Sequence, residues 1–264
     1  MHPIERLRYV ARVGGVDQGE LVREASGALG GFGDDIGGLI VSCRRLLDRH
    51  PTAGALWTLS ARLLSTGDLA GEAWRFSEEV DGDPTVGHIA RLLPDEARVC
   101  VVGWPELTAL ALPRRGDIEV LCVDASGDGS ALARRLRGAD VVAVDVPDAG
   151  AAAAATHSDL VLLEANCAGP DGFISPSGSL AVAATAHHAG VPVWVVAGAG
   201  RCLPQRLWQV ACDRLARDAA WEAPEEVVPL DLAERMIGPK GGGPATDLAT
   251  RADCAPVPEL LETR

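Results

Sequence analysis

Five short apolar runs after Pro94 restrict the fold of this chain more than any other feature. They are rich in β-branched residues and lack alternating polar positions, which is typical of strands buried on both faces. Segments rich in alanine and arginine, good helix formers, separate them. This alternation predicts an α/β fold with a Rossmann-like parallel sheet. The runs are residues 98–102, 118–123, 140–144, 159–163 and 191–197.

The first 93 residues follow a different pattern. Apolar residues recur there at steps of three and four, as on the buried face of an amphipathic helix. Glycine-containing pairs separate one such face from the next. We therefore predict a helical N-terminal subdomain over residues 1–93 and the Rossmann-like α/β domain over residues 94–230. The clearest faces are Leu39, Ile40, Cys43, Leu46 and Leu47, and Leu56, Leu59, Leu63 and Leu64.

Residues 231–264 differ from both regions. They contain the stretch GPKGGGP and end in a proline-rich acidic segment, a composition typical of flexible chain. We predict a Gly/Pro-rich acidic C-terminal tail that is loosely ordered and solvated. Just before it, residues 227–230 (VVPL) are predicted to form a short edge strand.

Charge and cysteine spacing exclude several classes of function. The formal net charge is −13, and there is no local basic stripe, so we expect no binding to nucleic acid. No apolar stretch approaches the roughly 20 residues of a membrane span, and the first residues are too charged for a signal peptide. The seven cysteines lack the paired spacing of a zinc site. We expect a cytoplasmic protein with reduced thiols, no metal and no cofactor.

Polar residues follow several of the apolar runs, where this architecture places its ligands. Glu106, after the first run, is a candidate acid or base. Asp124, after the second, is placed to accept a hydrogen bond from a sugar hydroxyl. Glu164, Asn166 and Cys167 follow the fourth run as a polar cluster. Each position also has a purely structural interpretation, as part of a tight turn or a solvated loop.

Two further loops are candidates for binding an anion. Ser177, Gly178 and Ser179 open an alanine-rich helix, where hydroxyls and backbone N–H groups suit an anion or a carbonyl. Arg201 lies in the GAGR loop after the fifth run, at a place where an arginine can bind phosphate or carboxylate. The alternatives are simple helix capping for the first loop and a solvated surface arginine for the second.

The order of these parts resembles a known family. HPTAGALWTLSARLL stands in the helical region, HSDLVLLEANCAGPDGFISPSGSLAVAATAHHAGVPVWVVAGAGRCLP in the sheet region, and EEVVPLDLAERMIGPKG after it. This arrangement is similar to the alpha, beta and delta subunits of eukaryotic initiation factor 2B. Their family includes methylthioribose-1-phosphate and ribose-1,5-bisphosphate isomerases. The resemblance is most specific over residues 157–197.

The resemblance implies that the family's catalytic pair is missing here. In the isomerases, a strand-end cysteine and a strand-end aspartate move the proton or hydride. Gly103 stands at the place that matches the cysteine, and Asn166 at the place that matches the aspartate. An amide takes no proton near neutral pH, and glycine has no side-chain group. Any remaining chemistry would use Asn166, Cys167, Glu164 or Glu106.

The resemblance also implies weaker phosphate binding. The family's Arg-Pro-Thr matches the segment with His50 and Thr52, so an arginine is replaced by histidine. Its Asn-Lys-x-Gly-Thr matches residues 175–179, where Gly178 and the hydroxyl of Ser179 survive but the lysine does not. Cations that would face a phosphate are therefore reduced at both places.

The preferred hypothesis is an initiation factor 2B-like homodimer that binds a small molecule, a sugar phosphate or a nucleotide-like compound, without the standard isomerase chemistry. Asp124 favours a polyol or nucleoside over a bare phosphate. The alternatives are an aldose–ketose sugar-phosphate isomerase (an intramolecular oxidoreductase) with altered residues, and an assembly or regulatory partner related to the translation factor subunits. The expected ligand-binding residues are His50, Thr52, Gly103, Asp124, Asn166, Ser177, Gly178, Ser179 and Arg201, and the expected interface segments surround Trp194, Trp208 and Trp221.

Overall fold

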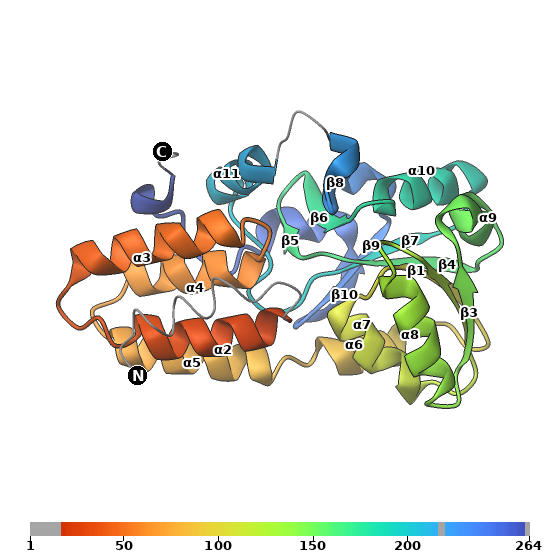
Figure 1. Cartoon of the computed structure of the whole chain (residues 1–264), viewed down its shortest axis with the longest axis horizontal. Helices are drawn as coiled ribbons and strands as arrows, with labels where there is room; N and C mark the ends of the chain where they lie inside the picture. The colour runs from red at the N-terminus through yellow and green to blue at the C-terminus, as the bar shows by residue number, and fades with distance from the viewer. Residues whose placement is uncertain (1–16, 216–219, 262–264) are drawn as a thin grey trace.

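The computed structural model describes residues 17–215 and 220–261 of the 264-residue chain. Within these ranges, four helices form a layer at one end of the molecule and an α/β unit forms most of the rest (Figure 1). This order of a helical region before a sheet is the predicted one. The four helices are α2 (Gln18–Leu29), α3 (Ile36–Arg49), α4 (Gly54–Leu64) and α5 (Leu69–Asp81).

Aspartates begin three of these helices. Asp17, Asp35 and Asp68 each accept a hydrogen bond from a backbone N–H of the first turn, at 2.7, 2.9 and 2.9 Å. Each bond satisfies one of the N–H groups that a helix start leaves without a partner. Helix α4 has no such cap at its first flanking residue, Ala53. Its first N–H groups bind to other parts of the protein, and this places α4 at the candidate site.

The helical layer has its own apolar core. Leu39 and Leu47 of α3 and Trp57 of α4 are fully buried in it, as the helical periodicity predicts. Helix α11 (Gln205–Leu215), from much later in the sequence, adds Trp208 to the same core. Trp208 was an expected interface residue, but its burial places it inside the monomer.

Seven strands of the described chain form the main sheet, in the order β10-β9-β7-β4-β1-β2-β3. All neighbouring strands run parallel except β10 and β9. All five apolar runs form strands in it, so the predicted parallel sheet is confirmed. The strands are β1 (Arg98–Val102), β2 (Glu119–Val123), β3 (Val142–Val146), β4 (Leu160–Glu164), β7 (Val193–Val196), β9 (Arg235–Gly238) and β10 (Gly241–Pro244).

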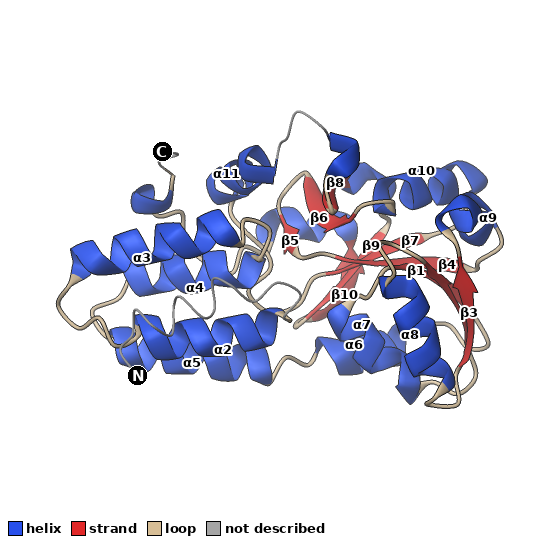
Figure 2. Cartoon of the chain, viewed as in Figure 1, coloured by secondary structure: helices blue, strands red, loops and turns tan. Residues whose placement is uncertain are grey.

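Helices cover both faces of this sheet (Figure 2). Val99 and Val101 of β1 point into one core, and Cys100 and Val102 point into the other, as expected for a strand buried on both sides. Helices α6 (Thr85–Leu92), α7 (Glu106–Ala111) and α8 (Asp128–Arg137) cover the first face, and α9 (Ala151–Thr156) and α10 (Ser179–Ala189) cover the second. Helix α6 therefore packs with the sheet, although it precedes residue 93.

The third apolar run becomes a strand two residues later than predicted, at Val142. Residues before it close helix α8, because the N–H of Val141 binds the carbonyl of Leu136 at 3.0 Å. Asp140, with φ of 60°, makes the left-handed turn that this closure needs. Short 3-10 helices elsewhere are Leu112–Arg114, Asp148–Gly150, Ala220–Glu222, Leu230–Leu232, Ala245–Thr250 and Pro258–Leu260.

A second, antiparallel sheet lies against the main one. It consists of β5 (Cys167–Ala168), β6 (Gly172–Pro176) and β8 (Glu225–Pro229), with β8 at its edge. The predicted edge strand around residues 227–230 is therefore confirmed, beginning two residues earlier. In the pairing of β6 with β8, Ser175 lies opposite Glu226 and Pro176 lies opposite Glu225. This register brings two carboxylates to the start of α10.

The prediction of a loosely ordered tail is wrong for much of residues 231–264. Strand β9 pairs with β7 inside the main sheet and buries Met236 and Ile237. Further on, Val257 and Leu260 are buried in the core of the helical layer. The glycines that suggested flexibility form the hairpin partner β10. A few well-placed apolar residues are enough to order this segment because the rest of the fold supplies their surroundings.

No helix in the described residues is long and apolar enough to cross a membrane. In the same residues, no group of three or more His, Cys, Asp or Glu side chains is arranged to hold a metal ion.

Candidate functional site

A cavity of about 1090 Å³ lies between the helical layer and the carboxyl ends of the strands of the main sheet. This edge is where ligands bind in open α/β sheets. Its wall comes from the ends of β1, β2 and β4, the starts of α2 and α10, the loop before α4, and the end of α11. The expected site residues on this wall are His50, Thr52, Glu106, Asp124, Glu164, Asn166, Ser177 and Gly178.

Gly103 lies between two wall residues, Val102 and Trp104, at the end of β1. Its φ is +64°, in the left-handed region that glycine enters without steric cost. A Cβ atom at this position would lie 3.5 Å from the Cβ of Ala125 and 3.7 Å from that of Pro176. A side chain therefore has room here, but the backbone conformation disfavours one.

Asn166 connects the end of β4 to the helical layer. Its backbone carbonyl accepts a hydrogen bond from Nε2 of Gln18 at 2.8 Å and another from the N–H of Gly54 at 3.0 Å. Its side-chain Nδ2 donates to the carboxylate of Glu225. The half-buried amide thus donates to a carboxylate. An aspartate at this position would lose that hydrogen bond and would place two negative charges side by side.

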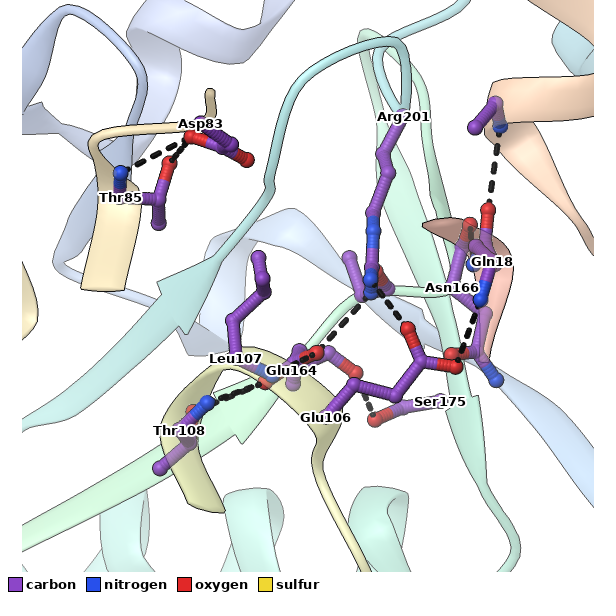
Figure 3. Close-up of polar contacts among 12 residues, drawn as sticks. Gln18, Asp83, Thr85, Glu106, Leu107, Thr108, Glu164, Asn166, Ser175 and Arg201 are labelled. Atoms are coloured by element: carbon purple, nitrogen blue, oxygen red, sulfur yellow. Dashed lines mark hydrogen bonds and ion pairs between the residues drawn. The ribbon is translucent and has the colours of Figure 1, made fainter. Parts of the chain in front are cut away.

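A buried ion network lies behind the wall (Figure 3). Nη1 of Arg201 donates to Oε1 of Glu164 at 3.0 Å, and its Nη2 donates to Oε2 of Glu106 at 2.5 Å. The Arg201 side chain is only 5% exposed, and it is not part of the cavity wall. The expectation that Arg201 faces a ligand is therefore wrong, because two carboxylates hold its guanidinium inside the protein.

Both carboxylates of the network have further partners. Glu164 accepts hydrogen bonds from the N–H groups of Leu107 and Thr108 at 3.0 and 2.9 Å, and from the Thr108 hydroxyl at 2.9 Å. Glu106 accepts one from the N–H of Gln18 at 3.1 Å. Burial raises the pKa of the Glu106 carboxyl, and the Arg201 charge acts against that rise. The network therefore joins α2, α7, β4 and the loop after β7.

Cys167 does not reach the cavity. It lies in β5, fully buried in the core of the helical layer. Burial raises the pKa of its thiol far above the ordinary value, so the thiolate needed for nucleophilic chemistry is disfavoured. The hypothesis that Cys167 acts in catalysis is not supported by this position.

The start of α10 does not offer the open N–H groups that the sequence suggested. Oε1 of Glu226 accepts hydrogen bonds from the N–H groups of Gly178 and Leu180, at 2.7 and 2.9 Å. Oγ of Ser177 donates to the carbonyl of Ala223 at 2.5 Å. The Ser179 side chain is fully buried and is not on the wall. Sequence reasoning missed Glu226 because the pairing of β8 with β6 brings it here.

Two other helix starts at the cavity are also capped from within. Oδ1 of Asp124 accepts hydrogen bonds from the N–H groups of Gly129 and Ser130 at 3.0 and 3.3 Å, which caps α8. At α4, Oε1 of Gln18 accepts a hydrogen bond from the N–H of Ala55 at 3.1 Å. A glutamine near the start of the described chain thus completes a helix start that has no cap of its own.

Acidic groups dominate the wall. Apart from the Glu106 and Glu164 carboxylates that Arg201 binds, it carries Asp17, Asp124, Asp128, Asp148 and Glu225. The basic groups are Arg49, His50 and Arg214, at the side near the helical layer. The guanidinium of Arg214 lies 4.8 Å from the ring centre of Trp57 and 3.4 Å from the Asp48 carboxylate. Burial lowers the pKa of Arg214.

Sequence comparison finds no counterpart, since no protein-family profile and no curated protein matches the chain. Comparison of structures finds similar proteins. A translation initiation factor eIF-2B structure from Pyrococcus horikoshii superposes with a TM-score of 0.74 and 14% identity, covering 91% of this chain and 96% of that one. This chain has the eIF2B fold.

Two further structures extend the likeness. One is the tetrameric eIF2B-beta2-delta2 complex from C. thermophilum, with a TM-score of 0.72, 14% identity and coverage of 94% of this chain and 92% of that one. The other is 5-methylthioribose 1-phosphate isomerase from Pyrococcus horikoshii, with a TM-score of 0.66, 14% identity and coverage of 95% and 87%. The eIF2B fold is therefore matched over nearly the whole chain by both a translation factor and an isomerase, which confirms the resemblance in fold.

Proposed function

We propose that this chain is a small-molecule-binding protein with an eIF2B-like fold and without the isomerase chemistry of its structural relatives. The observation that carries this proposal is the chemical state of the cavity wall. The sequence resemblance implies that Asn166 and Gly103 replace the isomerases' aspartate and cysteine. Asn166 lies on the wall, and Cys167 is buried away from it. The cavity nevertheless has the size and place of a ligand site.

Of the two carboxylates that Arg201 binds, the buried one, Glu164, has a clear structural role. Glu164 receives four hydrogen bonds, from Leu107, from the N–H and the hydroxyl of Thr108, and from Arg201. Both of its oxygen atoms are thus occupied by groups of the chain itself, so Glu164 has a structural role in joining β4 to α7 and to the loop after β7. Glu106 supports the alternative hypothesis, an isomerase with altered residues. It lies on the wall, and burial raises its pKa, as is common for a carboxyl that acts as a catalytic acid or base.

The test follows the aldose and ketose forms of sugar phosphates by NMR. We expect no interconversion of ribose 1,5-bisphosphate or methylthioribose 1-phosphate by the unmodified protein. We also expect none from the variant that combines Gly103→Cys with Asn166→Asp, because a new aspartate would face Glu225 and a cysteine at φ +64° is strained. Turnover by the unmodified protein that Glu106→Gln abolishes would establish the isomerase alternative and remove the binding-only proposal.

We further propose that the chain forms a homodimer through its sheet. Strand β3 lies at one edge of the main sheet, and its Val142 and Val144 are 62% and 40% exposed. An apolar edge of this kind favours pairing with another chain. Light scattering at tens of micromolar is expected to give the mass of a dimer, and Val142→Glu is expected to give a monomer. A monomeric unmodified protein would contradict this.

The third hypothesis is a partner in an assembly related to the translation factor subunits. It draws support from the eIF2B complex among the structural relatives. A stable dimer that binds no ligand of any class would favour this function over the proposed one.

A further inference from the structure

We propose that the cavity selects a polyhydroxylated ligand without a phosphate group. A ligand that also carries an amine binds most tightly. Glu226 is the residue that excludes phosphate. This inference rests on the proposed binding function and adds the chemical class of the ligand. It departs from the sugar phosphate or nucleotide that the sequence suggested.

The first observation concerns the helix starts at the cavity. A helix N-terminus attracts phosphate because its first N–H groups lack partners and its dipole is positive there. At the starts of α4, α7, α8 and α10, which border this cavity, two N–H groups each are bound by oxygen atoms of the chain itself. Three carboxylates do this: Glu164 at α7, Asp124 at α8 and Glu226 at α10. At α4, the acceptors are the side chain of Gln18 and the carbonyl of Asn166.

Glu226 is the most direct of these substitutes. A single oxygen, Oε1, accepts hydrogen bonds from the N–H of Gly178, the residue just before α10, at 2.7 Å and from the N–H of Leu180 in its first turn at 2.9 Å. It occupies the position at which a bound phosphate oxygen would accept the same two bonds. A phosphate approaching Gly178 would therefore meet a carboxylate, and the two negative charges repel each other. Glu226 is not itself a wall residue, but Gly178, whose N–H it binds, and the neighbouring Glu225 are, and the Glu225 charge adds to this repulsion.

The second observation concerns the cations. Arg201 lies in the GAGR loop, which the sequence suggested as an anion site, but it is held between two carboxylates. On the side near the helical layer, Arg214 is stacked on Trp57 and paired with Asp48. A phosphate would thus enter a cavity whose acidic groups outnumber its basic ones.

The third observation is what the wall does offer. Asp124 uses Oδ1 to cap α8, and Asp128, Asp148 and Glu225 also line the cavity. Carboxylate oxygens accept hydrogen bonds from hydroxyl and ammonium groups, and they bind the ammonium more strongly because of its charge. The cavity volume of about 1090 Å³ is ample for a sugar-sized ligand.

The experiment compares three compounds with one carbon skeleton: glucosamine, glucose and glucose 6-phosphate. Binding to the full chain is measured by ligand-detected NMR titration at constant ionic strength. For the unmodified protein we expect glucosamine to bind most tightly, glucose next, and glucose 6-phosphate at least tenfold more weakly than glucosamine. The same order is expected at two protein concentrations, so that self-association does not enter.

The variants test Glu226 itself. Glu226→Ala opens the start of α10, and Glu226→Gln removes the charge while keeping an oxygen that accepts the two N–H groups. Both are expected to bind glucose 6-phosphate at least tenfold more tightly than the unmodified protein does. Glu222→Ala, which removes one exposed negative charge a few residues away, is the matched control and is expected to change this affinity less than twofold.

Tighter binding of glucose 6-phosphate than of glucosamine by the unmodified protein would overturn the inference while leaving the proposed function intact. An equal gain of phosphate affinity in Glu222→Ala and Glu226→Gln would overturn the role of Glu226. If the unmodified protein binds none of the three but Glu226→Ala gains phosphate binding, the exclusion by Glu226 is supported and the proposed binding function is not.

Discussion

Replacing Arg201 with leucine is expected to lower the free energy of unfolding by about 3–5 kcal/mol at pH 7, the range for a broken buried ion pair. The change leaves Glu106 and Glu164 without the cation that both of them contact. Glu164 is almost completely buried, so its charge has no access to water. Urea unfolding followed by circular dichroism measures the loss.

The control for this prediction is Arg98→Leu. Arg98 forms an ion pair with Glu119 at 2.6 Å, but both side chains are substantially exposed, at 45% and 32%. Exposed pairs of this kind contribute about 0–1 kcal/mol. A loss at Arg201 no larger than the loss at Arg98 would show that the buried network is not a stabilising feature of the fold.

The pH gives a second readout for Arg201→Leu. Burial raises the pKa of Glu106, and Arg201 opposes that rise, so the pKa is expected to increase further in the variant. The folded variant then holds a proton at a pH at which the unfolded chain has lost it, and its stability falls as pH increases. The deficit relative to the unmodified protein is therefore expected to be larger at pH 7 than at pH 5. An equal deficit at both would mean that packing, not charge, explains the loss.

Replacing Gly54 with alanine is expected to lower the free energy of unfolding by about 1–3 kcal/mol, as overpacking does. A Cβ atom there would lie 2.9 Å from the carbonyl oxygen of Arg201 and 3.0 Å from that of Asn166. Both contacts are with backbone, which cannot move away as a side-chain tip can. The start of α4 would be pushed from the loops that form the cavity, so ligand binding should weaken as well.

Gly87→Ala is the matched control for Gly54→Ala. Gly87 also lies in a helix, α6, but nothing stands within 4 Å of a Cβ atom built there. Because alanine favours the helix over glycine, this variant is expected to be more stable by about 0.5–1 kcal/mol. Both are compared in the same urea titration. Two variants of equal stability would contradict the close approach at Gly54.

The strands were predictable where their signal is local. Residues 99–102 and 160–163 are unbroken apolar runs, and a parallel sheet buries such runs on both faces. Strand β9 carries only Met236 and Ile237 as large apolar residues beside a glycine-rich stretch, and its burial depends on β7 and β10. No local pattern could have shown that, because the partners lie elsewhere in the chain.

The site was predictable in place but not in detail. Polar residues after strands converge because the carboxyl ends of parallel strands share one edge, and this brought Asp124 and Asn166 to the cavity wall. Whether each polar group is free to bind a ligand depends on partners that are distant in the sequence. Glu226 caps a helix start 48 residues earlier in the sequence, and Glu106 pairs with an arginine 95 residues away. Spacing along a chain carries no record of such pairs.

The position of β9 in the sheet has a consequence for synthesis on the ribosome. Strand β7 lies between β4 and β9, so its second edge stays open until residues 235–238 have emerged. At ordinary elongation rates this delay lasts a few seconds. During that time the nascent chain presents an unpaired, largely apolar strand. We expect general chaperones to bind the nascent chain at this stage. Slow codons between β7 and β9 are expected to reduce the yield of folded protein.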